Sequence, residues 1–241
     1  MRRLPPTPSL PGRRSLTLGA GALPGLARLG LAVPLRVAPA WGQAPPRRLA
    51  APTPPQPAGP FYPLDWSGDV DADLVRLAGE AARAQGTVMH LRGRVLDTRG
   101  APMPGAMIEI WQCDANGRYR HPRDRRDGRD PGFQGRGRAV AGADGSFAFR
   151  TIRPVPYPGR TPHIHLAVAV PPHRPPAALQ PGAAPSLVTQ LYLADEPANE
   201  RDALFLRLRD PEAREALLLR PVAADRIEPG ALLAMRDIVI G

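Results

Sequence analysis

Apolar and polar residues alternate in short runs through most of the chain after residue 85, which is the pattern of half-buried β-strands. Gly and Pro residues separate these runs, as at Asp144-Gly145. The run at 106–111 alternates less cleanly and predicts a more buried strand. Short strands joined by Gly/Pro turns predict a mainly β fold, an antiparallel β-sandwich with short helices. The predicted strands lie at residues 89–95, 106–111, 147–149, 163–170, 187–193 and 233–240.

Two segments have helical features. Leu74, Leu77 and Ala81 recur at helical spacing within Asp71–Gln85, so this segment is expected to form a short helix. Asp210-Pro211-Glu212 resembles a helix start, with a capping carboxylate before a proline at the first helical position. Both helices would accompany the sandwich without forming its core.

The first 40 residues have the features of an export signal. Arg13-Arg14 precedes an uncharged stretch of about 13 residues, too short to span a membrane, which takes about 20. Ala38-Pro39-Ala40 then supplies a cleavage-site pattern. A twin-arginine signal, cleaved after Ala40, predicts a periplasmic protein without a stable membrane anchor; a disordered basic tail is the alternative. Residues 41–58 are expected to be a Pro/Ala-rich linker and residues 59–241 the catalytic domain.

The net charge of +10 does not indicate nucleic-acid binding. Residues 1–40 hold six of the 32 basic residues and none of the 22 acidic ones, so much of the excess lies in the expected signal. The rest of the chain has no stripe of interleaved basic and aromatic residues, so no nucleic-acid partner is expected. The single cysteine, Cys113, excludes an internal disulfide and is expected at the edge of the core.

The strongest chemical signal precedes and enters the strand at 163–170. His163 and His165 lie two residues apart and therefore project from the same face of that strand. Two hydrogen-bonded histidines on a polar sheet face would be the better explanation of a bare His-x-His pair. Tyr157 and Arg160, just upstream in a Pro/Gly-rich loop, change that balance. Imidazole nitrogens with phenolate oxygens favour ferric iron, because only a strong Lewis acid lowers the tyrosine pKa far enough.

Other candidates are weaker from the residues alone. Tyr119, beyond the strand at 106–111, supplies a second potential phenolate. His121 is expected at the surface or beside the site, and His90 is expected to be solvated. Tyr62 either packs over the site entrance or anchors the segment 59–63.

Several motifs together resemble the intradiol ring-cleavage dioxygenases, and within them the protocatechuate 3,4-dioxygenase branch in its β-type chain. The resemblance runs from about Gly59 to the C-terminus. It is carried by residues 108–112 (IEIWQ), 117–121 (GRYRH), 149–154 (FRTIRP), 160–165 (RTPHIH) and 189–192 (TQLY).

This resemblance implies a β-sandwich with non-haem Fe(III) that cleaves a catechol-type ring with O₂ to a cis,cis-muconate-type diacid. It implies Tyr119, Tyr157, His163 and His165 as ligands, with Tyr157 leaving when the substrate chelates. By the same resemblance Arg160 stabilises negative charge on the substrate and Gln190 lies in the pocket. A homo-oligomer or a related partner chain is also implied.

The sequence departs from the family pattern in one respect that affects substrate choice. The loop between Tyr157 and His163 is shorter than in the well-known protocatechuate and catechol enzymes, so the shape of the pocket does not transfer. Residues 95–106 also resemble the opening of transthyretin-like and carboxypeptidase-regulatory sandwich modules, which leaves an exported binding module without catalysis as the alternative. A Zn²⁺ hydrolase built on His163 and His165 lacks an obvious carboxylate ligand nearby.

Overall fold

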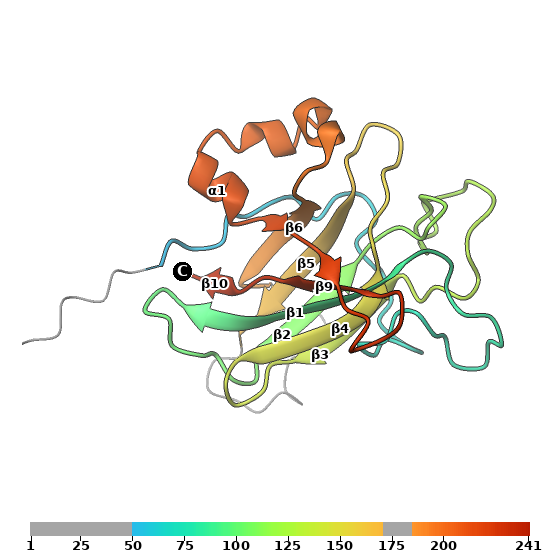
Figure 1. Cartoon of the computed structure of the whole chain (residues 1–241), viewed down its shortest axis with the longest axis horizontal. Coiled ribbons are helices and arrows are strands. Elements are labelled where there is room, and N and C mark those ends of the chain that lie inside the picture. The colour runs from blue at the N-terminus through green and yellow to red at the C-terminus, as the bar shows by residue number, and fades with distance from the viewer. Residues whose placement is uncertain (1–49, 171–184) are drawn as a thin grey trace, which may run out of the picture. The chain divides into compact units, whose positions relative to one another are not determined.

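Two five-stranded sheets, formed within the described residues, enclose one apolar core in the computed structural model, which describes residues 50–170 and 185–241 (Figure 1). In the first sheet, β9 and β10 pair with successive stretches of β1, β8 pairs with β9, and β4 pairs with β1 along its other edge. The second sheet has the order β3-β2-β5-β6-β7. The predicted mainly β sandwich is therefore confirmed. The strands are β1 (Val88–Asp97), β2 (Met107–Trp111), β3 (Arg136–Val140), β4 (Ser146–Ile152), β5 (His163–Ala169), β6 (Leu187–Leu193), β7 (Leu218–Leu219), β8 (Val222–Ala223), β9 (Leu232–Met235) and β10 (Ile238–Ile240).

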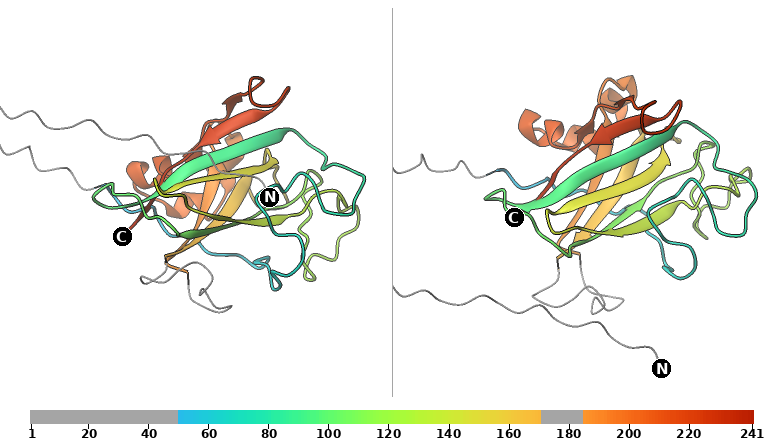
Figure 2. Two further views of the ribbon diagram at one scale, coloured as in Figure 1. Left: turned by 90° about the horizontal axis from the view of Figure 1, so that it is seen from below. Right: turned by 60° about the horizontal axis from the view of Figure 1, so that its bottom comes forward.

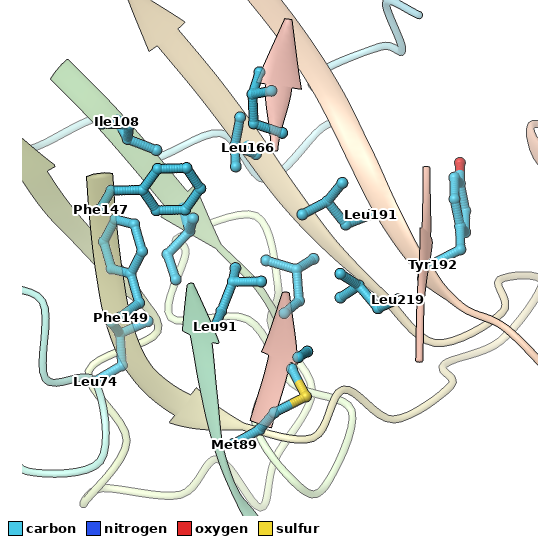
Figure 3. Close-up of a cluster of buried hydrophobic side chains, with 14 of the residues drawn as sticks. Leu74, Met89, Leu91, Ile108, Phe147, Phe149, Leu166, Leu191, Tyr192 and Leu219 are labelled. Carbon is cyan, nitrogen blue, oxygen red and sulfur yellow. The ribbon is translucent and has the colours of Figure 1, made fainter. Parts of the chain in front are cut away.

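Strand alternation determines which side chains meet between the sheets. Figure 2 shows the sheets as two layers, and Figure 3 shows the apolar side chains that fill the space between them. Leu91 and Phe149 enter the core from the first sheet, and Ile108 and Leu166 enter it from the second. Because successive residues of a strand point to opposite faces, Ile164 and Leu166 in the core leave His163 and His165 on the outer face of the second sheet. The predicted division of faces in β5 is confirmed.

The expected helix at 71–85 is absent; the described segment is a series of turns. The helical bond from the Ala78 N–H to the Leu74 carbonyl is replaced by two others: Asp69 accepts from the Ala78 N–H at 2.6 Å, and the Leu74 carbonyl accepts from the Gln134 N–H at 3.0 Å. Such local side-chain bonds compete with helix formation. Leu74 is nevertheless buried, because the segment packs against the core without helical geometry.

The second predicted helix is confirmed as α1 (Pro211–Glu215), with Asp210 accepting from the Glu212 N–H. Two short 3-10 helices precede it, η2 (Pro197–Arg201) and η3 (Phe205–Arg207). The single run expected at 233–240 is divided into β9, which pairs with Met89–Arg92, and β10, which pairs with Val95–Asp97. Between these stretches the Arg94 N–H donates to the Asp237 side chain. The short strands β3, β7 and β8 had no clear signal in the sequence.

The described part of the expected linker lies along the sheets. The Thr53 N–H donates to the Val239 carbonyl, and the Gln56 N–H donates to the Val188 carbonyl. Backbone hydrogen bonds hold a Pro/Ala-rich segment without requiring large apolar side chains. The domain boundary at residue 58 stays a prediction, and the expected export signal lies outside the described residues. No helix in residues 50–170 and 185–241 is long and apolar enough to cross a membrane.

Candidate metal centre

Four aromatic rings converge on the outer face of the second sheet. His163 and His165 project from β5, Tyr119 follows β2, and Tyr157 lies in the loop between β4 and β5. Ring-centroid distances of 4.8 Å between the histidines, 5.5 Å from His163 to Tyr157, 5.6 Å between the tyrosines and 6.2 Å from Tyr119 to His165 close a circle. The four residues that the resemblance implied as ligands are thus brought together by the fold.

The imidazoles of His163 and His165 direct their Nε2 atoms toward each other. His163 Nδ1 lies 2.6 Å from the carbonyl oxygen of Thr161, which only accepts, so Nδ1 carries the proton and Nε2 has a free lone pair. The two Nε2 atoms are 3.2 Å apart. Burial, with a contribution from Arg160, lowers the pKa of His163 to about 4, and burial, with contributions from His163 and Arg160, holds the pKa of His165 well below its usual value. Both rings are therefore neutral at neutral pH, the state in which histidine binds metals.

The phenol groups complete a donor set that fits a cation. Tyr119 is 3% exposed, and its Oη has no hydrogen-bond partner among the described residues. Burial and the neighbouring Tyr157 raise its pKa well above 10, so a phenolate here requires a strongly charged metal. Residues 50–170 and 185–241 contain no group of three or more His, Cys, Asp or Glu side chains arranged so that they could hold a metal ion. The donor chemistry accordingly fits ferric iron and does not fit an ordinary zinc site.

A tight turn places Arg160 beside these rings. The Arg160 N–H donates to the Tyr157 carbonyl at 2.9 Å, and Gly159 within this turn has φ +81°, which glycine tolerates well. Arg160 Nη2 donates to Gln190 Oε1 at 2.6 Å, and Gln190 Nε2 donates to the Pro57 carbonyl at 2.7 Å. Arg160 and Gln190 therefore belong to the same site, joined by a direct hydrogen bond.

A cavity of about 180 Å³ lies beside Tyr157 and Arg160, the space closest to the converged rings. Its other lining residues are Gly159, Thr161, Ala198, Arg201 and Asp202. A larger cavity of about 440 Å³, lined by residues of the 69–83 segment, contains none of the four candidate ligands. Its size therefore does not indicate the reaction site, because the metal donors lie elsewhere.

The segment 59–62 covers the ring cluster. Phe61 stacks on Tyr119 with centroids 4.5 Å apart. The Tyr62 hydroxyl donates to Glu109 Oε2 at 2.7 Å, and burial with the Glu109 contact raises the Tyr62 pKa to about 12. Tyr62 therefore anchors the segment, which decides between the two roles left open by the sequence.

Trp111 supports the histidines from the neighbouring strand. Its ring lies parallel to that of His165, with centroids 4.9 Å apart and 5° between the planes. Trp111 and Glu109 were not singled out from the sequence, although their spacing places them on one face of β2. Trp111 and His165 are directly opposite each other in the pairing of β2 with β5, which brings their rings into contact.

The structure decides the two remaining histidine expectations. Of the two places expected for His121, the one beside the site is correct: the side chain is 4% exposed, its Nδ1 accepts from the Arg123 N–H at 3.1 Å, and its ring lies 5.8 Å from that of Phe61, which stacks on Tyr119. His90 is not solvated, because its Nε2 lies 3.2 Å from Glu228 Oε2. Cys113 is buried as expected, with Sγ 3.6 Å from the Val155 carbonyl.

Known proteins resemble much of this chain. The sequence profile of the family described as "Dioxygenase" matches residues 58–225. The protocatechuate 3,4-dioxygenase beta chain of Burkholderia cepacia is 34% identical over 190 residues, which cover 75% of this chain and 76% of that protein. The hydroxyquinol 1,2-dioxygenase of Corynebacterium glutamicum is 33% identical over 61% of this chain, which spans only 48% of that longer protein.

A solved structure agrees with the fold. The dioxygenase domain of a dioxygenase carbohydrate-binding protein fusion from Streptomyces sp. SirexAA-E is 33% identical, with a TM-score of 0.57. The match covers 79% of this chain and 98% of that domain. The similarity therefore extends over nearly the whole of that solved domain.

Proposed function

Because the chain belongs to the intradiol dioxygenase family, we propose that it binds one non-haem ferric ion and uses O₂ to cleave a catechol-type ring between its two hydroxyl-bearing carbons. The product would be a cis,cis-muconate-type diacid. Tyr119, Tyr157, His163 and His165 would hold the iron. Export by a twin-arginine signal belongs to the same proposal.

The convergence of two neutral imidazoles with two tyrosines is the observation that carries the proposal. The facing Nε2 atoms, 3.2 Å apart, and the unpartnered Oη of Tyr119 are buried polar atoms that a cation would satisfy. When bound, ferric iron would convert the phenols to phenolates and chelate the two oxygens of a catechol, activating its ring toward O₂.

The two tyrosines differ in a way that suits different roles. Tyr119 is buried beneath Phe61, whereas Tyr157 is half-buried and lines the 180 Å³ cavity. Tyr157 is therefore suited to give up its position when a substrate enters, and its oxygen can accept a proton from the substrate. Tyr119 is buried and does not line this cavity, so it would stay bound to the metal when a substrate enters.

Arg160 would stabilise the negative charge of the bound catechol. Its guanidinium is permanently charged and lines the cavity next to Tyr157. A fixed cation at this position acts as an oxyanion-hole donor does, an effect worth about 3–4 kcal/mol per donor. Gln190 binds Arg160 through Oε1 and the Pro57 carbonyl through Nε2, so both ends of its amide are used. We therefore propose that Gln190 orients Arg160.

The visible spectrum of the iron-loaded protein tests this function. The wild type is expected to show a tyrosinate-to-Fe(III) charge-transfer band that shifts on anaerobic addition of catechol. Admission of O₂ should then give a diacid carrying both oxygen atoms of ¹⁸O₂. Catechol, hydroxyquinol and protocatechuate are the probes, because relatives are named for these substrates.

Tyrosine variants make the test specific. Tyr119→Phe is expected to lose most of the band, while the matched control Tyr62→Phe keeps it, since the Tyr62 hydroxyl binds Glu109. A colourless wild type that takes up no iron and cleaves none of the three probes would overturn the proposal. Equal bands in both variants would remove Tyr119 from the ligand set.

A further inference from the structure

Asp202, a carboxylate that sequence reasoning did not single out, accepts four hydrogen bonds next to the proposed site. It lies at the end of η2, and its side chain has no exposed surface. Oδ1 accepts from the backbone N–H groups of Leu204 and Phe205 at 2.8 and 3.1 Å. These bonds fix the carboxylate to the backbone between η2 and η3, so Oδ2 occupies a defined position.

Oδ2 of Asp202 binds two groups that matter for the proposed chemistry. It accepts from Arg160 Nε at 2.8 Å and from the Thr161 N–H at 2.9 Å. The Thr161 carbonyl is the acceptor for His163 Nδ1. A single oxygen atom therefore contacts the charge-stabilising arginine and also the residue that sets the protonation of an iron ligand.

The remaining contacts limit where Arg160 and Thr161 can move. Arg160 Nη2 is held by Gln190, which leaves Nη1 as the guanidinium nitrogen without a hydrogen bond to the described residues. Thr161 Oγ1 donates to Asn199 Oδ1 at 2.8 Å, and Asn199 Nδ2 donates to the Leu193 carbonyl. An arginine fixed at both Nε and Nη2 has lost its rotamer freedom before substrate arrives, so none is lost in the reaction.

We propose that Asp202 is the positioning residue of this site, orienting Arg160 toward the cavity and the Thr161 peptide toward His163. The inference rests on the proposed function for its catalytic consequence, while the contacts themselves are independent of it. Burial alone raises the pKa of Asp202, but hydrogen bonds from Thr161 and Arg160 lower it below the usual range, so the group is charged at neutral pH.

Asp202→Asn is the discriminating variant. The amide oxygen can still bind Leu204 and Phe205, while the amide NH₂ would face the Arg160 and Thr161 donors. Asp210→Asn is the matched control, since Asp210 caps α1 through one exposed bond to the Glu212 N–H. Loss of an outer partner of a metal site typically costs about 10–100-fold in activity. We expect that loss in kcat for Asp202→Asn, with the charge-transfer band retained and KM little changed.

The double variant separates positioning from folding. In an Arg160→Gln background, Asp202→Asn is expected to lower kcat by a clearly smaller factor than in the wild type, because one of the two groups that it positions is already gone while the Thr161 contact remains. An equal loss in both backgrounds would indicate a merely structural role and overturn the proposal. Unchanged kcat in the single variant would overturn it as well.

A readout on the metal-free protein is independent of activity. The Arg160 Nε–H signal in ¹H–¹⁵N spectra is assigned by its loss in Arg160→Lys. Its proton should exchange slowly with water in the wild type and in Asp210→Asn, and fast in Asp202→Asn. Fast exchange of this proton in the wild type would refute the positioning of Arg160 by Asp202, even if Asp202→Asn does not fold. A wild type that neither binds iron nor cleaves catechol would instead refute the proposed function, while this signal still decides the positioning.

Discussion

Replacing Glu228 by Gln should lower the stability of the fold through one charge network. Glu228 accepts from Arg150 at 2.7 and 2.8 Å and from Arg83 at 3.0 Å, and it lies 3.2 Å from His90. Arg150 in turn donates to both oxygens of Asp73. The network joins the turns at 69–85, strands β1 and β4 and the loop before β9, which are distant in sequence.

The magnitude follows from the carboxylate's pKa. Hydrogen bonds from Arg150, opposed by burial, lower the pKa of Glu228 from 4.5 to about 2. At about 1.4 kcal/mol per pH unit, this sets an upper bound of roughly 3.5 kcal/mol on its contribution at neutral pH. The side chain is 20% exposed, so solvent screening reduces the expected loss to about 1–2 kcal/mol. For a domain of this size that corresponds to about 3–6 °C in Tm.

The pH dependence has a definite sign. A carboxylate whose pKa is lower in the folded state stabilises the protein when charged. The difference in free energy of unfolding between wild type and Glu228→Gln should therefore be full above pH 4.5 and disappear as the pH falls through about 2. Other carboxyl groups titrate in both proteins and cancel in this difference.

Urea unfolding of the metal-free proteins, followed by circular dichroism between pH 7 and the acid limit of folding, measures this difference. Glu215→Gln is the matched control: Glu215 and Arg220 also form a two-bond ion pair, but both side chains are 54% exposed, so no measurable change is expected. The loss of stability for Glu228→Gln should be clearly smaller at pH 3 than at pH 7, and a loss that stays constant over this range or grows toward acid pH would refute the reasoning. Equal effects of the two substitutions at pH 7 would refute it too.

Two further substitutions test the site and its support. Gly59→Ala forces φ +71° on alanine, costing about 1–2 kcal/mol, and places a Cβ 3.3 Å from His165 Cε1. Gly230→Ala meets similar strain at φ +73° in open space, so only Gly59→Ala should also reduce the iron charge-transfer band; equal bands would contradict this contact. Asp124→Asn should lose about 2 kcal/mol in urea unfolding at pH 7, because the Asp124 carboxylate accepts charged hydrogen bonds from Arg126, which help lower its pKa to about 2. That loss should vanish as the pH falls through about 2, and wild-type stability at pH 7 would contradict it.

Local patterns predicted most of the strands correctly. The alternation at 187–193 matches the bounds of β6, and the alternation in β5 correctly placed both histidines on one face. The helix at 71–85 was wrong because apolar spacing alone does not reveal that Asp69 captures the Ala78 N–H or that the Leu74 carbonyl binds the Gln134 N–H. His90 was misplaced because its partner, Glu228, is 138 residues away.

The sequence by itself determined the donor chemistry of this protein: two histidines with strand spacing, a tyrosine and an arginine just upstream, and no competing cysteine cluster. These choices are local, since residue type and spacing fix which atoms share a face. Only the tertiary structure decided that Tyr119 completes the ring cluster, that Trp111 stacks on His165, and that Asp202 holds Arg160. Those contacts depend on strand register and loop closure over tens of residues, which arise from burying the whole core and are not encoded in any one segment.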